Sequence, residues 1–146
     1  MHITPISAEA VLPLRQAILR PGRPLEDAVF PHDTDPETVH FGAFVDEELV
    51  GVASVYHEPQ PGRDDPLEWR LRGMAVTERM QRQGIGSALL RACVTHVREQ
   101  GGRLLWFNAR TAAVPFYRAH GFAVVGEEFE IPDVGPHFVM RGRVGP

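Results

Sequence analysis

The middle of the chain carries a strand, a glycine turn, a helix and a second strand in close succession, and this order constrains the fold more than any other feature. Residues 67–76 are rich in β-forming side chains, and Gly84 and Gly86 follow them. Apolar residues then repeat with helical spacing through 87–100, and 103–108 has the composition of a second strand. Because a helix joins the two strands, the sequence predicts a parallel crossover inside a sheet.

The flanking segments predict further strands and helices. Two β-rich runs, 39–45 and 49–56, are separated by three acidic residues, which favours an antiparallel hairpin. No internal repeat or change of composition divides the chain. We therefore expect one α/β domain over residues 1–146, with a mixed, mostly antiparallel sheet flanked by helices. The expected strands are 2–6, 39–45, 49–56, 67–76, 103–108, 123–129 and 138–144, and the expected helices lie within 7–20, 87–100 and 112–120.

Composition excludes several classes of function. The net charge is −4 with both signs interspersed, so no basic stripe is available for nucleic acid. The single cysteine, Cys93, forms no internal disulfide, and no Cys/His spacing indicates a metal site. Residues 1–10 have no signal-peptide pattern, and no apolar run is long enough for a membrane span. We expect a cytoplasmic protein without metal and without nucleic-acid or membrane partners.

The turn Gln81-Arg82-Gln83-Gly84-Ile85-Gly86 has the character of an anion site. A helix start leaves backbone N–H groups unpaired and carries partial positive charge, so phosphate groups bind there. Glycine at positions 84 and 86 removes Cβ atoms that would obstruct a ligand, and Arg79 and Arg82 add charge. A plain tight turn is the alternative interpretation of the glycines alone.

Two other phosphate-binding patterns do not fit this turn. A P-loop ends in Gly-Lys-Ser/Thr, whereas this chain has Gly86-Ser87-Ala88. A dinucleotide-binding fingerprint requires a third glycine and an acidic residue further on, and Leu89 and Asn108 occupy those positions. NTP hydrolysis and dinucleotide binding are both disfavoured.

A second group of residues follows in the order expected of a known family. The turn has the pattern Gln/Arg-x-x-Gly-x-Gly/Ala, and an Asn at a strand end precedes Ala-x-x-Phe-Tyr-x-x-x-Gly-Phe. With both motifs present, the chain resembles the GNAT superfamily of acetyl-CoA-dependent N-acetyltransferases over nearly its whole length. The matching residues are Gln81, Gly84, Gly86, Asn108, Ala113, Phe116, Tyr117, Gly121 and Phe122.

The resemblance implies a GNAT-type fold and direct transfer of an acetyl group from acetyl-CoA to a primary amine of a small molecule, peptide or protein. The strand before the turn would pair with the pantetheine arm, the turn would hold the pyrophosphate, and Tyr117 would protonate the leaving thiolate. Asn108 as a turn cap and Tyr117 as a core residue are the alternatives. The implied coenzyme-binding residues are Met74, Ala75, Val76, Gln81, Arg82, Gln83, Gly84, Ile85, Gly86, Ser87, Asn108 and Tyr117.

The general base is less well defined. Some family members carry a glutamate where this chain has Arg70. Glu68 lies two residues earlier on the same strand face, so it is one candidate base, and pairing with a nearby arginine such as Arg70 or Arg72 is its alternative role. His137 is a second candidate, as base or as substrate anchor, with a role-free surface histidine as the alternative.

The acceptor side carries no readable motif. We expect its pocket to form from loops 21–37 and 58–66 and the final hairpin. An acidic run at Glu127, Glu128, Glu130 and Asp133 could attract a cationic amine or be a solvated edge. A non-catalytic acyl-CoA sensor on the same fold is the alternative function, and a homodimer is possible.

Overall fold

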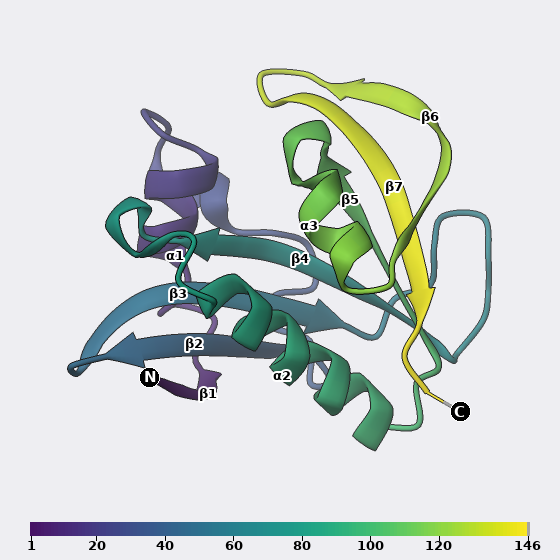
Figure 1. Ribbon diagram of the computed structural model, residues 1–146, viewed down its shortest axis with the longest axis horizontal. Helices are drawn as coiled ribbons and strands as arrows, with labels where there is room; N and C mark the ends of the chain where they lie inside the picture. The colour runs from purple at the N-terminus through teal and green to yellow at the C-terminus, as the bar shows by residue number, and fades with distance from the viewer. Residues whose placement is uncertain (146) are drawn as a thin grey trace.

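The structure is a computed structural model that describes residues 1–145. Seven strands form one sheet in the order β1-β2-β3-β4-β5-β7-β6, and every neighbouring pair is antiparallel except β4 and β5. This confirms the predicted mixed sheet with one parallel crossover (Figure 1). The strands are β1 (His2–Ile6), β2 (Val39–Val45), β3 (Glu48–Tyr56), β4 (Glu68–Val76), β5 (Leu104–Arg110), β6 (Ala123–Ile131) and β7 (Gly135–Arg143).

Helices cover both faces of the sheet. The helical elements are α1 (Leu12–Leu14), the π-helix η1 (Arg15–Leu19), the 3-10 turns η2 (Leu25–Ala28), η3 (Glu78–Met80) and η4 (Thr111–Ala113), and the α-helices α2 (Ile85–Glu99) and α3 (Val114–Ala119). Successive residues of β3 separate the two faces, because Ala53 joins the core beneath α2 and α3 whereas Val52 packs with Val11 beside α1. The helices α2 and α3 therefore share one face, and α1 with η1 covers the other.

The strands β4 and β5 pair only at their beginnings. Their register covers Glu68 to Arg70 against Leu104 to Trp106, and Figure 1 shows the two strands diverging beyond that point. Beyond Trp106, β5 still pairs with β7 on its other side. Within residues 1–145, no strand pairs with the β5-facing edge of β4 after Arg70. That edge keeps backbone donors and acceptors for another partner.

A β-bulge interrupts β4 within this open part. Val52 pairs with Ala75 and Ser54 with Arg72, so Gly73 and Met74 together lie opposite one residue of β3. Gly73 has φ of 72°, and an added Cβ would lie 2.9 Å from Arg15 Nε. Both the backbone conformation and the contact with Arg15 require glycine at this position.

The first helical segment differs most from the sequence expectation. Ser7 Oγ accepts a hydrogen bond from the Ala10 N–H at 3.1 Å, so Ser7 caps a turn, and regular α-helix lasts only three residues before η1. The π-helix is continuous with α1 and carries Arg15, which is fully buried. Elsewhere β5 extends to Arg110, and β7 begins at Gly135 because the β6–β7 hairpin pairs Ile131 with that residue.

Candidate functional site

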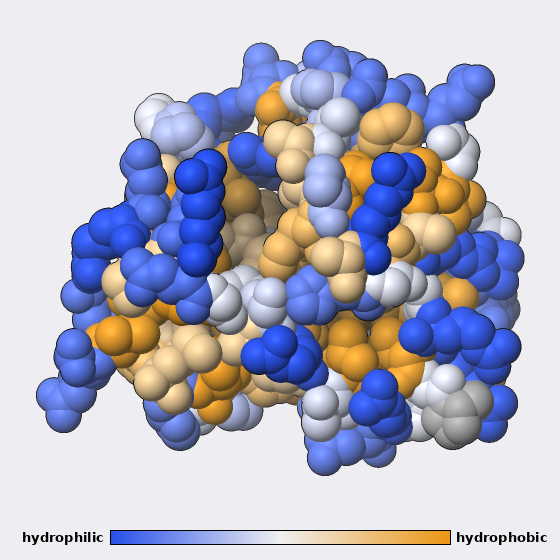
Figure 2. All heavy atoms as spheres, in the orientation of Figure 1, coloured by the Kyte–Doolittle hydropathy of each residue, from blue (hydrophilic) through white to orange (hydrophobic). Residues whose placement is uncertain are grey.

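A cavity of about 430 Å³ occupies the opening between β4 and β5. Figure 2 shows a hollow in the surface at this place, with hydrophilic residues along its left border and apolar residues along its right. Its walls come from the open part of β4, the end of β5, α3, the end of η1, Phe30 and the β6–β7 hairpin. The 58–66 loop, which we expected to line an acceptor pocket, supplies none of the lining residues.

Met74, Ala75 and Val76 line the cavity with their backbone edge free. An extended ligand with amide groups fits such an edge as an added strand, since it satisfies N–H and C=O groups that no protein strand reaches. These three residues were predicted as the pantetheine-binding strand, and their geometry suits that role.

The glycine turn lies where β4 leads into α2. Gly84 is the N-terminal cap of α2 with φ of 83°, and Arg82 also has a left-handed φ of 65°. No side chain caps the helix start, and residues 81–84 are exposed. The first N–H groups of α2 are therefore open to an anion. An added Cβ at Gly84 would meet nothing within 4 Å, so this position requires glycine for its backbone conformation.

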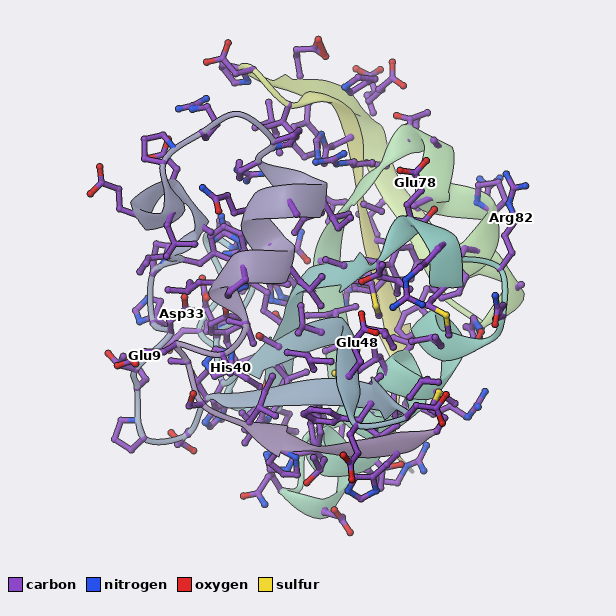
Figure 3. The ribbon with its side chains drawn as sticks, turned by 90° about the vertical axis from the view of Figure 1, so that its left-hand side faces the viewer. Glu9, Asp33, His40, Glu48, Glu78 and Arg82 are labelled. Atoms are coloured by element: carbon purple, nitrogen blue, oxygen red, sulfur yellow. The ribbon has the colours of Figure 1, made fainter. Side chains whose placement is uncertain are left out.

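Side chains of the turn hold its shape. Gln81 Nε2 donates to the Val76 carbonyl at 3.0 Å, and Gln83 Nε2 donates to the Arg79 carbonyl at 3.4 Å. Arg79 also forms an ion pair with Glu48. The Arg82 side chain extends from the turn beside Glu78 (Figure 3). Of the two arginines predicted to add charge, Arg79 already has a carboxylate partner.

The first three residues of α2 lie close to other parts of the protein. Ile85 is buried in the core, an added Cβ at Gly86 would lie 3.5 Å from the Phe116 ring, and Ser87 Oγ lies 2.9 Å from His120 Nε2. Coenzyme binding by these residues remains a prediction, and their backbone N–H groups are the atoms suited to it.

Tyr117 reaches the cavity from α3. Its ring is 4.3 Å from the Phe107 ring and 5.0 Å from the Phe116 ring, and only 7% of the residue is exposed. Burial raises the pKa of Tyr117, with a smaller contribution from Cys93, so its hydroxyl stays protonated at neutral pH. Within residues 1–145 the hydroxyl has no hydrogen-bond partner that shifts this pKa. A protonated phenol beside a cavity is suited to donate a proton.

Asn108 lines the same cavity from β5. The strand continues to Arg110, and the following turn η4 starts from Arg110 without a side-chain cap. The alternative role of Asn108 as cap of that turn is therefore wrong, because two strand residues separate it from the turn. Its amide remains a group that can contact a ligand.

Glu68 is not part of the cavity lining. It is 1% exposed, and its carboxylate accepts hydrogen bonds from the Gln60 N–H at 3.0 Å and from Arg63 Nε at 2.5 Å. The alternative role of Glu68 as the partner of a nearby arginine is confirmed, but that arginine is Arg63 of the preceding loop and not Arg70 or Arg72. Glu68 fastens that loop to β4, and we do not propose it as the base.

His137 lies in the cavity wall and is 5% exposed. Its Nδ1 lies 2.8 Å from the Gly135 carbonyl oxygen. A carbonyl only accepts hydrogen bonds, so Nδ1 is the protonated nitrogen and the neutral ring keeps a free electron pair on Nε2. His137 is therefore not a surface residue, and its role as base or substrate anchor stays a prediction.

Four arginines that the sequence analysis did not assign to the site also line the cavity. They are Arg20, Arg70, Arg72 and Arg110. Arg70 and Arg72 lie two residues apart on one strand, and this spacing could have indicated that both face the same site. The other two arrive from distant segments, which no local pattern indicates. The acidic residues of the β6 run are absent from this lining.

The described part of the chain contains no group of three or more His, Cys, Asp or Glu side chains that could hold a metal ion. No helix within residues 1–145 combines the length and the hydropathy needed to cross a bilayer.

Comparison with known proteins gives consistent matches. The model of the acetyltransferase (GNAT) family matches residues 9–122. The uncharacterized N-acetyltransferase YitI of Bacillus subtilis (strain 168) is 34% identical over 140 residues, which are 96% of this chain and 94% of YitI.

Solved structures share the fold. The ribosomal-protein-S18-alanine N-acetyltransferase of Escherichia coli has a TM-score of 0.77 at 19% identity, covering 99% of this chain and 94% of that one. An aminoglycoside 6'-N-acetyltransferase complexed with coenzyme A has a TM-score of 0.73 at 16% identity, covering 100% and 98%. At these identities the likeness concerns the fold, and the named substrates belong to those proteins.

Proposed function

The chain belongs to the GNAT family of acetyltransferases, and we propose that it moves the acetyl group of acetyl-CoA directly to a primary amine bound beside it. The observation that carries this proposal is the placement of three features in and beside one cavity. The free edge of β4 and the protonated hydroxyl of Tyr117 line the cavity, and the open N-terminus of α2 follows the turn after β4.

Acetyl-CoA fits the first two features in a single extended pose. The free backbone edge at Met74 to Val76 suits the amides of the pantetheine arm, and the start of α2 suits the pyrophosphate. Coenzyme A is bound in one structural neighbour with the same fold. Asn108, which lines the cavity opposite β4, is placed to contact the arm.

The protein groups supply positioning and proton transfer. The amine nitrogen attacks the thioester carbonyl carbon, the carbon–sulfur bond breaks, and the sulfur leaves with the bonding electrons. In our proposal Tyr117 gives its proton to that sulfur, and Nε2 of His137 takes the proton that the amine loses. Backbone N–H groups at the Gly73 bulge are suited to stabilise the carbonyl oxygen as it gains negative charge.

Release of the free CoA thiol tests this function. The full chain is incubated with acetyl-CoA and a panel of primary amines, and thiol is followed with a chromogenic reagent while acetyl-CoA binding is measured by calorimetry. We expect thiol release that depends on the amine. Binding of acetyl-CoA with no amine-dependent release from any panel member would instead identify a non-catalytic acyl-CoA sensor.

The proposal also covers the size of the acceptor, the location of the protein and its oligomeric state. An acceptor of small-molecule or peptide size fits a cavity of about 430 Å³ that also receives the acetyl end of the coenzyme. A cytoplasmic location is consistent with acetyl-CoA as co-substrate. Dimerisation stays a prediction, which light scattering of the purified chain would test.

A further inference from the structure

Four guanidinium groups and no carboxylate line the cavity. We use the term arginine cluster for Arg20, Arg70, Arg72 and Arg110, and the remaining lining residues include neither Asp nor Glu. The whole chain has a net charge of −4, so the positive charge at the cavity is opposite in sign to the net charge of the protein. A cavity with such a lining attracts anions and disfavours cations.

Aromatic and carbonyl contacts hold the cluster in place. The Phe30 ring lies under the guanidinium of Arg72 at 4.2 Å and of Arg20 at 5.5 Å. The Leu19 carbonyl accepts hydrogen bonds from Arg20 Nη1 at 2.9 Å and from Arg110 Nη2 at 3.1 Å. These contacts orient the guanidinium groups without neutralising their charge.

Within residues 1–145 Arg20, Arg72 and Arg110 form no salt bridge, and only Arg70 of the cluster pairs with a carboxylate, that of Glu58. Arg72 donates no hydrogen bond to a carboxylate or carbonyl within residues 1–145. Burial and the charges of neighbouring arginines lower the pKa of Arg72. Arg70 has one 3.3 Å contact with Glu58, and its buried Nε has no partner in the described chain. Several donors of the cluster are thus left for a ligand.

Arg15 shows how this protein treats an arginine that is purely structural. Its guanidinium forms a bidentate pair with Asp33 at 2.7 and 3.1 Å and also donates to the Ala28 carbonyl, Ser54 Oγ and Tyr56 Oη. The contrast with Arg72 is clear, because both guanidiniums lie on the Phe30 ring but only Arg15 has a carboxylate partner.

The cluster is also separate from the proposed pyrophosphate site. Trp69 and Leu71 pack beneath α2, so Arg70 and Arg72, which alternate with them, lie on the opposite face of β4. Figure 3 shows Arg82 of the glycine turn and Asp33, which fixes the Phe30 segment through the Phe30 N–H, on opposite sides of the view. The phosphates of the coenzyme therefore do not account for the arginine cluster.

We propose that the acetyl acceptor is a small amine that carries a carboxylate or a phosphate, and that the arginine cluster binds this anionic group. This inference rests on the proposed acetyltransferase function. A guanidinium presents paired N–H donors that match two oxygens of either group. With the anion held there, the amine end can extend toward His137, which shares the cavity.

A matched panel of acceptors tests the charge requirement. Amino acids are compared with their amides, O-phosphoethanolamine with ethanolamine, and spermidine and an aminoglycoside form the cationic arm. Rates of CoA thiol release are expressed per neutral amine, since the members differ in basicity. We expect kcat/KM at least tenfold higher for the anionic member of the preferred pair, and the preferred pair tells carboxylate from phosphate.

The possible outcomes separate the two proposals. Equal or faster turnover of the neutral or cationic members overturns the anionic acceptor and leaves the acetyltransferase function standing. Binding of acetyl-CoA without release from any member overturns both proposals.

Variants test the arginines themselves. Arg72→Gln and Arg20→Gln should each raise KM for the anionic acceptor by roughly 10- to 150-fold, the loss expected for one charge-assisted hydrogen bond, and leave the acetyl-CoA Kd unchanged. Arg72→Lys keeps the charge and should recover part of the loss. Arg91→Gln, at an exposed position of α2, is the matched control and should behave as the parent protein.

Selectivity is the readout that a merely structural role would not move. In Arg72→Gln the preference for the anionic member over its neutral partner should fall toward unity. An equal loss for both members, or a raised acetyl-CoA Kd with unchanged selectivity, would overturn the assignment.

Discussion

Removing one oxygen atom from Tyr117 is the sharpest test of the proposed proton donor. In Tyr117→Phe the ring keeps its packing against Phe107 and Phe116. Removing the hydroxyl breaks no hydrogen bond to the protein that shifts the pKa of Tyr117. The change therefore removes a proton donor and little else. General acid catalysis contributes about 10²- to 10⁴-fold, so kcat should fall at least about 100-fold, or about 2.7 kcal/mol of transition-state stabilisation.

The assay measures kcat from CoA thiol release and the acetyl-CoA Kd by calorimetry. The Kd should change by less than about twofold, because the proton is needed only when the thiolate leaves. Burial raises the pKa of Tyr117 above its ordinary value near 10, so the acid form persists through the assay range. No loss of rate should come from this group below about pH 10.

The chain contains only two tyrosines, and the second is a matched control. Tyr56 donates to Asp33 Oδ1 at 2.5 Å, away from the cavity lining. Tyr56→Phe should lower the free energy of unfolding by roughly 1.5–3 kcal/mol, the value of a hydrogen bond to a charged group, while kcat stays within about twofold. Unchanged kcat in Tyr117→Phe, or equal losses in both variants, would refute the acid role.

Three further predictions concern the base, the glycine turn and the buried ion pair. His137→Asn should lower kcat at least about 100-fold and leave the acetyl-CoA Kd within about twofold, and an unchanged kcat would remove His137 as base. Gly84→Ala should weaken acetyl-CoA binding about tenfold, since a left-handed φ costs alanine about 1–2 kcal/mol, whereas Gly62→Ala, at the same φ of 83° in a distant loop, should leave the Kd unchanged. Asp33→Asn should lower the free energy of unfolding by about 3–5 kcal/mol in chemical denaturation, because it leaves Arg15 buried without a counterion. Although burial alone would raise the pKa of Asp33, hydrogen bonds from Arg15, Tyr56 and the Phe30 N–H hold it below its usual range. Its stabilisation is therefore full above the unfolded pKa of about 3.9 and is lost as the pH falls through the lower folded pKa. The Asn variant should lack this acid-side loss.

The coenzyme side of the site could be predicted because its determinants are local in the sequence. A free helix start follows from a strand, a glycine turn and a helix in direct succession, and residues 81–86 contain all that the turn requires. The helix α2 and most strands lie within a few residues of their predicted bounds for the same reason. A strand, turn or helix that depends only on neighbouring residues can therefore be predicted from the sequence.

The acceptor side depends on contacts between distant segments. Arg15 stands among the apolar residues of the first helix, and no local pattern indicates that it would pair with Asp33, eighteen positions away. Arg20 and Arg110 meet at the Leu19 carbonyl although Arg110 comes from a strand far along the chain. Glu68 lies on the predicted strand, but its carboxylate forms a salt bridge with Arg63 of the adjacent loop.

The bulge at Gly73 changes which residues of β4 share a face of the sheet. Strict alternation along 68–76 would put all even-numbered residues on one face, so that Arg72 and Met74 would point the same way. The extra residue at the bulge reverses this order, because Met74 and Val76 pack with Leu71 beneath α2, whereas Ala75 packs beside α1. The coenzyme-binding edge and the arginine cluster can therefore occupy consecutive residues of one strand and still lie on different sides of the sheet. A single glycine with a left-handed φ, at a position where an added Cβ would lie 2.9 Å from Arg15 Nε, thus separates the donor half of the proposed reaction from the acceptor half.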